Sequence, residues 1–255
     1  MLSQLLSHPL TRDADLDSPD TTILRRRIIA EKPLLRSIYK EWYDFIAAAV
    51  PAGPGQVLEL GAGAGFFKEV LPESLASEIF FLPDIDLVCD GCCLPVADGA
   101  LRAVVMTDVF HHLPRVDAFL AEINRCVRPG GVVAMVEPWV TPWSRFVFGK
   151  LHHEPFLPAA SWRFAASGPL SGANGALPWI VLCRDRERFL SICPDWEIET
   201  PLLMMPLRYL LSGGVSLRSL VPGGCHGLLV GIEACLSPVM DKLALFAGLV
   251  LRRRA

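Results

Sequence analysis

Apolar residues in the first part of the chain recur with the spacing of a helix. Between Ile23 and Val50 they fall three and four positions apart, at Leu34, Leu35, Ile38, Trp42, Phe45 and Ile46. This spacing places them in one stripe on a helix that faces a core. Residues 1–22 before it are polar and acidic, and we expect them to be loosely ordered.

From residue 56 to residue 138 short apolar runs alternate with helical patterns. The predicted strands are Gln56–Leu60, Leu75–Ile79, Asp86–Cys89, Ala103–Met106 and Val132–Val136. A short helix is predicted over Phe66–Leu71 and a longer one from Pro114 to Arg128, where Pro129 and two glycines end it. Alternation of this kind predicts an α/β fold with a doubly wound, Rossmann-like sheet and helices on both faces.

The pattern after residue 138 is less regular. Residues 139–179 are rich in Trp, Pro, Gly and His, and 202–220 is ambiguous. Further along, the pattern predicts helices over Arg184–Ile192 and Leu228–Leu245, a strand over Trp196–Thr200 and a closing edge strand over Phe246–Leu251. We therefore expect a tail and N-terminal helical cap (1–55), a core (56–138), and inserted lid segments with closing strands of the same domain (139–255).

The charge balance disfavours nucleic acid as a partner. Lys and Arg total 24 against 27 Asp and Glu, so the formal net charge is −3, whereas phosphate binding needs clustered basic residues.

Hydrophobic residues make up 52% of the chain, which raises the question of a membrane span. The longest charge-free stretch, Phe164–Cys183, is interrupted by Gly and Pro, so no spanning helix is predicted.

The N-terminus lacks the basic start of a secretion signal, so we expect a cytoplasmic protein. Peripheral membrane contact stays open, because arginine triplets stand at 25–27 and 252–254. The eight cysteines do not form a disulfide scaffold in a chain of this length. The one C-x-x-C, at Cys89 and Cys92, has no second ligand pair, and no metal site is expected.

The most informative segment is a glycine turn between a predicted strand and a predicted helix. It contains Gly61, Gly63 and Gly65, with Glu59 two residues before the first glycine. Glycines here let the backbone pass close to a ligand. No Lys-Ser/Thr follows, which excludes a triphosphate loop, and the third glycine comes too early for the G-x-G-x-x-G of dinucleotide sites.

This Glu59-x-Gly61-x-Gly63-x-Gly65 pattern resembles the first motif of the class I S-adenosylmethionine-dependent methyltransferases, of the methyltransferase type 11 kind. Three further segments are similar to that family in the same order: Asp90-Gly91 with 94–98, the run 104–113, and 120–135 with its Pro-Gly-Gly turn. The resemblance covers about 56–138. It implies a seven-stranded sheet, S-adenosylmethionine as the cofactor, and a small-molecule methyl acceptor.

The resemblance also implies roles for individual residues. The cofactor contacts it suggests are Glu59, Gly61, Ala62, Gly63, Gly65, Glu78, Asp90, Gly91 and Asp108. Glu59 would orient the loop or the cofactor's ammonium group, and Asp90 and Gly91 would meet adenine. Because Pro72 shortens the first helix, the acid that holds the ribose is Glu78 or, with a longer hairpin, Asp84.

Candidate bases must lie at the carboxyl ends of the strands, where ligands bind in such sheets. They are His111, His112 and His153, although the His-His-Leu stretch is often a structural helix start in similar proteins.

The apolar segments after residue 138 indicate a lid over a hydrophobic or saccharide-lipid acceptor, which we expect to be methylated on oxygen. The alternative is a non-catalytic subunit of the same fold.

Overall fold

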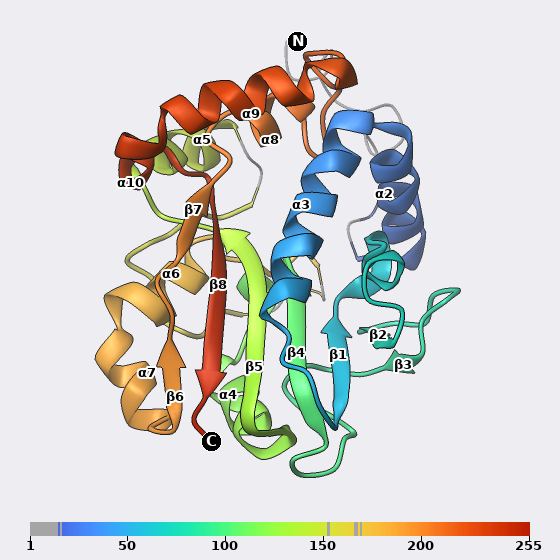
Figure 1. Ribbon diagram of the computed structural model, residues 1–255, viewed down its shortest axis with the longest axis vertical. Helices are drawn as coiled ribbons and strands as arrows, with labels where there is room; N and C mark the ends of the chain where they lie inside the picture. Colours follow the sequence, from blue (N-terminus) through green and yellow to red (C-terminus); the bar gives the residue numbers. More distant parts are fainter. Residues whose placement is uncertain (1–14, 16, 152–153, 166–167, 169) are drawn as a thin grey trace.

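The computed structural model describes residues 15, 17–151, 154–165, 168 and 170–255. A single mixed sheet forms the centre, with helices on both of its faces (Figure 1). Its strands are β1 (Gln56–Leu60), β2 (Ser74–Glu78), β3 (Leu87–Val88), β4 (Leu101–Thr107), β5 (Val127–Pro138), β6 (Trp196–Ile198), β7 (Leu202–Met204) and β8 (Phe246–Arg253). The α/β class and the Rossmann-like, doubly wound arrangement are therefore confirmed.

The eight described strands occupy seven positions across the sheet, in the order β3-β2-β1-β4-β5-β8-β6. The first five run parallel, and β8 runs antiparallel to β5. Both β6 and β7 pair with β8, at opposite ends of that strand. The prediction that Phe246–Leu251 closes the sheet as an edge strand is therefore wrong. Every residue of that run is buried, as an interior strand covered on both faces requires.

The helices are α2 (Pro19–Glu31), α3 (Pro33–Ala49), α4 (Val116–Cys126), α5 (Pro142–Leu151), α6 (Leu177–Trp179), α7 (Arg186–Ile192), α8 (Arg208–Ser212), α9 (His226–Cys235) and α10 (Met240–Leu243). The helix predicted from Ile23 to Val50 is in fact two. Lys32 adopts an extended conformation before Pro33, as the proline ring requires, and the chain turns there.

Three further expectations are wrong. Residues 18–22, expected to be loose, begin α2: the Ser18 hydroxyl accepts a hydrogen bond from Asp20 N, and Pro19 occupies the first turn. The helix predicted over Leu228–Leu245 consists of α9, a 3₁₀ turn (Ser237–Val239) and α10, because Pro238 interrupts it. The predicted helix Phe66–Leu71 is only a 3₁₀ turn at Phe67–Glu69.

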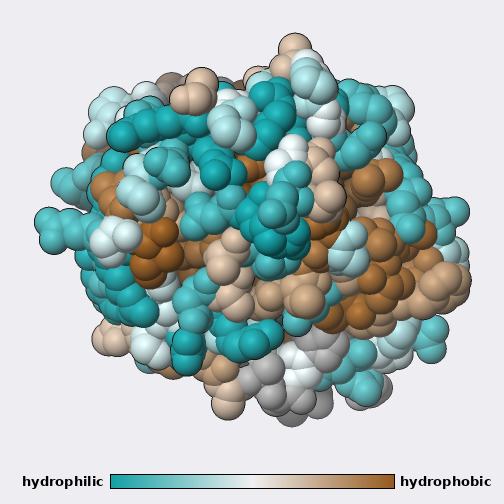
Figure 2. All heavy atoms as spheres, turned by 90° about the horizontal axis from the view of Figure 1, so that it is seen from below, coloured by the Kyte–Doolittle hydropathy of each residue, from teal (hydrophilic) through white to brown (hydrophobic). Residues whose placement is uncertain are grey.

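The sheet separates two apolar layers. Leu58, Val104 and Met106 point to the layer that contains α4, while Val57 and Val105 point to the layer that contains α3. Successive strand residues face opposite sides, so each buried strand supplies both layers. The outer surface seen from below shows hydrophobic residues gathered in patches among hydrophilic ones (Figure 2).

Trp42 on α3 is the centre of an aromatic cluster that joins the N-terminal helices to β8. It is fully buried, stacks on Tyr209 with a centroid distance of 5.7 Å, and lies 4.9 Å from the Phe246 ring. Its Nε1 hydrogen has no acceptor among the described residues. The cluster therefore depends on the area and shape of the ring and not on a hydrogen bond.

This predicts a contrast between two substitutions. Trp42→Ala should lower the free energy of unfolding by about 3–5 kcal/mol, because it leaves a large cavity. Trp42→Phe should cost less than half of that, since it keeps a ring and removes a buried, unbonded N–H. Urea denaturation of both variants measures the two losses; equal losses would contradict this account of the cluster.

Candidate active site

The parallel strands point toward the end of the molecule where α5, α8 and α9 lie (Figure 1). A cavity of about 1060 Å³ lies at this end, lined by the exits of β1, β2 and β4 and by residues of α2, α3, α5, α8 and β8. Open α/β sheets bind their ligands at this edge. One small ligand typically occupies a pocket of ~300–1,000 Å³, so this cavity is just above the upper end of that range.

The glycine turn forms one end of the cavity. Gly61 has φ +67°, a left-handed conformation that favours glycine, and a Cβ atom there would overlap Val109 Cγ2. A Cβ on Gly65 would overlap the Tyr43 hydroxyl. Ala62 and Gly63 lie in the 3₁₀ turn that follows, and the Gly63 carbonyl accepts a hydrogen bond from Arg26 Nε at 2.9 Å. Val109 and Tyr43 thus pack so closely on the turn that Gly61 and Gly65 have no room for a side chain.

Two buried carboxyl groups, Glu59 and Glu78, line this end. The Glu78 carboxylate accepts hydrogen bonds from Gly63 N at 3.0 Å and from Ile79 N at 3.1 Å, yet burial keeps its pKa above the usual value. The Glu59 carboxyl receives no hydrogen bond from a described residue. Burial, with the nearby Glu78, raises the pKa of Glu59 to about 8, so the group is mostly protonated at neutral pH.

The two candidates for the second acid are placed very differently. Glu78 ends β2 and lines the cavity. The side chain of Asp84 is 87% exposed and lies 3.5 Å from the Arg26 guanidinium. Only Glu78 therefore faces the cavity.

Asp90 and Gly91 line the same end beyond β3. The Asp90 Oδ1 accepts a hydrogen bond from Cys92 N at 2.8 Å and closes the turn. Together with the glycine turn and Glu78, these residues form one continuous wall. All nine residues predicted as cofactor contacts thus lie at or beside one cavity.

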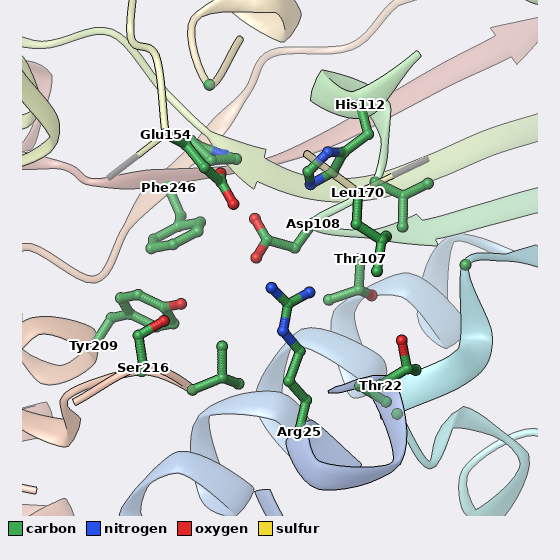
Figure 3. A pocket seen from close by; sticks show the side chains of 18 of the residues that line it. Thr22, Arg25, Thr107, Asp108, His112, Glu154, Leu170, Tyr209, Ser216 and Phe246 are labelled. Atoms are coloured by element: carbon green, nitrogen blue, oxygen red, sulfur yellow. The ribbon is translucent and has the colours of Figure 1, made fainter. Parts of the chain in front are cut away.

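Asp108 projects into the middle of the cavity from the end of β4. Its φ of +61° is unusual for a residue other than glycine. The next turn is held by Glu137, whose carboxylate accepts from Val109 N at 2.8 Å and from Phe110 N at 2.6 Å. Figure 3 shows Arg25, His112 and Glu154 pointing toward Asp108 from different sides.

The charges around Asp108 set its protonation. Burial, together with Glu137 and Glu154, raises the pKa of Asp108 to about 7 against the opposing effect of His111 and Arg25. A carboxyl group in this position changes its charge near neutral pH, as general bases often do.

The adjacent histidines differ in protonation. Burial alone would lower the pKa of His111, but Glu137, bonded to its Nδ1 at 2.7 Å, and Glu154 hold that pKa well above its usual value. Burial lowers the pKa of His112 to about 3. Its Nδ1 donates to the Gly172 carbonyl at 3.0 Å, which leaves Nε2 as the acceptor. His153 lies outside the described residues.

The ligand atoms of His111, His112 and Glu154 lie within 4.8 Å of one another, a distance that a metal ion could bridge. A protonated His111 would have to release a proton before it could bind an ion. The described contacts of this cluster are those of an imidazolium between carboxylates.

The far end of the cavity is apolar. Its wall is formed by Tyr39, Val147, Phe148, Phe156, Tyr209, Leu210 and Phe246. Sequence reasoning assigned no role here to Arg25, which also lines the cavity. Arg25 could have been found from Ser18-Pro19, a helix start that places Thr21, Thr22 and Arg25 on one face of the next turns.

The raised pKa of Glu59 predicts a pH-dependent stability. The folded chain holds a proton that the unfolded chain, with a pKa of 4.5, releases, so this group stabilises the fold less as pH rises from about 5 to about 8. As pH rises from about 5 to about 8, the free energy of unfolding of Glu59→Gln should therefore increase by at least about 1 kcal/mol relative to that of the unsubstituted protein. This corresponds to about 2–4 °C in Tm. Thermal unfolding of the ligand-free protein measures it. Glu31→Gln, at an exposed residue, is the control. An equally large gain in stability in that variant would contradict the raised pKa of Glu59.

Comparison with known proteins agrees with this geometry. Residues 58–135 match the family described as a methyltransferase domain. An uncharacterized methyltransferase of Mycobacteroides abscessus is 25% identical over 154 residues, covering 52% of this chain and 60% of that protein. A demethylmenaquinone methyltransferase of Renibacterium salmoninarum is 30% identical over 113 residues, covering 38% of this chain and 48% of that protein. The chain thus spans about half to three fifths of the length of these relatives.

Among solved structures, the geranyl diphosphate C-methyltransferase of Streptomyces coelicolor, in complex with Mg²⁺, geranyl diphosphate and S-adenosyl-L-homocysteine, is similar in fold. The TM-score is 0.52 at 15% identity, covering 98% of this chain and 90% of that chain. Together with the matched domain and the glycine turn at the sheet's ligand-binding edge, this identifies the fold. Residues 58–135 thus match a methyltransferase domain, and the chain around them has the Rossmann-like fold of such enzymes.

Proposed function

We propose that the protein transfers a methyl group from S-adenosylmethionine to an oxygen of a small, largely apolar molecule. The observation that carries the proposal is one continuous cavity. It runs from the glycine turn, past Asp108, to the aromatic wall around Tyr209 and Phe246. Such an arrangement holds a methyl donor and an acceptor on either side of one carboxyl group.

The residues at the glycine end fit the cofactor. The unbonded Glu59 carboxyl suits a cationic ammonium group, whose arrival would favour the ionised form. The Glu78 carboxylate suits the two ribose hydroxyls, and Asp90 and Gly91 suit the adenine edge and face. When bound, the cofactor supplies an activated methyl group on sulfur.

The opposite end suits an acceptor that is mainly hydrophobic with one polar group. Aromatic side chains can surround a ring or an isoprenoid chain, while Arg25, His112 and Asp108 provide polar contacts near the middle. The names of two relatives, a demethylmenaquinone methyltransferase and a geranyl diphosphate C-methyltransferase, agree with an acceptor of this character. A saccharide carried on a lipid would combine both kinds of surface.

We assign the base to Asp108 and not to the histidines. His111 is already protonated between carboxylates, and His112 is too weakly basic to keep a proton at neutral pH. As the acceptor oxygen gains the methyl group, its proton passes to the Asp108 carboxylate, which Arg25 and His111 face. His112 Nε2 can accept a hydrogen bond from the acceptor and orient it.

The first test is cofactor binding. Calorimetry with S-adenosyl-L-homocysteine should give one site per chain. Glu78→Ala should weaken binding at least tenfold, since it removes the acceptor for two hydroxyls, whereas Asp84→Ala should leave it unchanged. An absence of binding at millimolar ligand would overturn the proposal, and equal losses in both variants would overturn the placement of the ribose.

A second test concerns the base. With an apolar phenol or hydroxylated isoprenoid as acceptor, kcat/KM should rise with pH through an apparent pKa near 7, because the reaction needs ionised Asp108. Asp108→Asn should lower kcat about 10²–10⁴-fold and abolish this pH dependence. Its Kd for S-adenosyl-L-homocysteine should stay within about twofold of that of the unsubstituted protein. NMR of the product separates O-methyl from C-methyl. Cofactor binding without transfer to any acceptor tested would favour the non-catalytic subunit.

A further inference from the structure

Helix α9 has its polarity reversed relative to a helix on a water-exposed surface. Its outward side chains include Leu228, which is 68% exposed, together with Val230 and Ile232. No exposed residue from Gly227 to Val239 carries a charge. A surface helix normally presents charged residues to water and apolar residues to the core, so this exposed face is costly in water.

The single carboxylate of α9 points inward. Glu233 is buried and accepts hydrogen bonds from Leu207 N at 3.0 Å, Arg208 N at 2.8 Å and Arg208 Nε at 2.5 Å. Arg208 in turn is bonded to Glu41 on α3 at 2.6 Å. The helix is thus fixed in this orientation by a buried ionic network, and its apolar face cannot simply rotate inward.

The apolar face of α9 continues onto neighbouring elements at the same end of the molecule (Figure 1). Phe146 and Leu151 on α5 are 54% and 58% exposed, and Leu220, in the loop before α9, is 55% exposed. We call the outward residues of α5, residues 218–220 and α9–α10 the apolar end surface. It lies over the carboxyl ends of the parallel strands.

The apolar end surface also carries positive charge. Four exposed basic residues belong to it: Arg145, Lys150, Arg218 and Lys242. None of them has an ion pair among the described residues, and the only exposed carboxylate within 142–151 and 218–243 is Asp241. Apolar side chains with a basic border match a bilayer that contains anionic lipids.

The cavity opens onto this same surface. Lys150, Leu151 and Leu220 line the cavity and are also exposed to solvent. A molecule that is anchored in a bilayer could therefore reach the cavity without its apolar part crossing water. A second copy of the chain would instead place four unpaired cations against four more, which opposes self-association.

No single described helix is long and apolar enough to cross a membrane, and the pair Gly223–Cys235 and Ser237–Leu243 that passes such a test together is bent by 59°. We propose that the apolar end surface docks on an anionic lipid bilayer, with α9 lying in the headgroup layer. Resting on the proposed function, the docked protein takes a lipid-borne acceptor directly into its cavity.

The test is flotation of the full chain with vesicles of phosphatidylcholine alone or with added phosphatidylglycerol. The protein should float with the anionic vesicles, more weakly with the neutral ones, and less at high salt. Leu228→Asp combined with Ile232→Asp should reduce binding at least tenfold. Phe81→Asp, at a 78% exposed residue in the β2–β3 loop, is the matched control and should not change it.

Binding of S-adenosyl-L-homocysteine, measured on the same variants, shows that each is folded and separates this proposal from the proposed function. No flotation of the unsubstituted protein, or an equal loss with Phe81→Asp, would overturn the docking proposal. A dimer in solution that the double substitution dissociates, without vesicle binding, would also overturn it and make the surface a subunit interface.

Discussion

The candidate site depends on one buried carboxylate, that of Glu137 at the end of β5. It is fully buried and accepts from Val109 N, Phe110 N and His111 Nδ1. These hydrogen bonds compensate the cost of burying its charge and hold the chain where it leaves β4. The position of Asp108 follows from them, because Asp108 directly precedes the bonded turn. Without Glu137, two backbone N–H groups and the Nδ1 of a buried imidazolium would lack their acceptor.

The same carboxylate influences the charge of the cavity. It keeps His111 protonated and contributes to the raised pKa of Asp108, so a cation and a titratable acid stand side by side. Arg25 from α2 adds a second cation that points toward Asp108 (Figure 3). The protonation of Asp108 is therefore coupled to the charges of its neighbours. That property suits a proton transfer that accompanies methyl transfer.

Much of the core could be predicted from sequence because its signals are local. Buried strands and the glycine turn each depend on residues within a few positions, and β1, β2, β4, β5 and the seven-position sheet follow the prediction. Glu78 was preferred to Asp84 on strand length, and only Glu78 faces the cavity.

The expectations that failed depend on contacts between distant segments. The interior place of β8 is set by pairing with β5, β6 and β7, which no local pattern encodes. The contribution of Arg25 to the cavity likewise depends on the packing of α2 against distant segments. The reversed polarity of α9 is visible only once Glu233 is seen to face Arg208.

A crystal structure with S-adenosyl-L-homocysteine tests the central claim, that one cavity holds donor and acceptor on either side of Asp108. The account predicts adenine beside Asp90 and Gly91, ribose against Glu78, and the sulfur facing Asp108 with the aromatic end still open. A cofactor bound outside the glycine turn, or a sulfur turned away from Asp108, would contradict it.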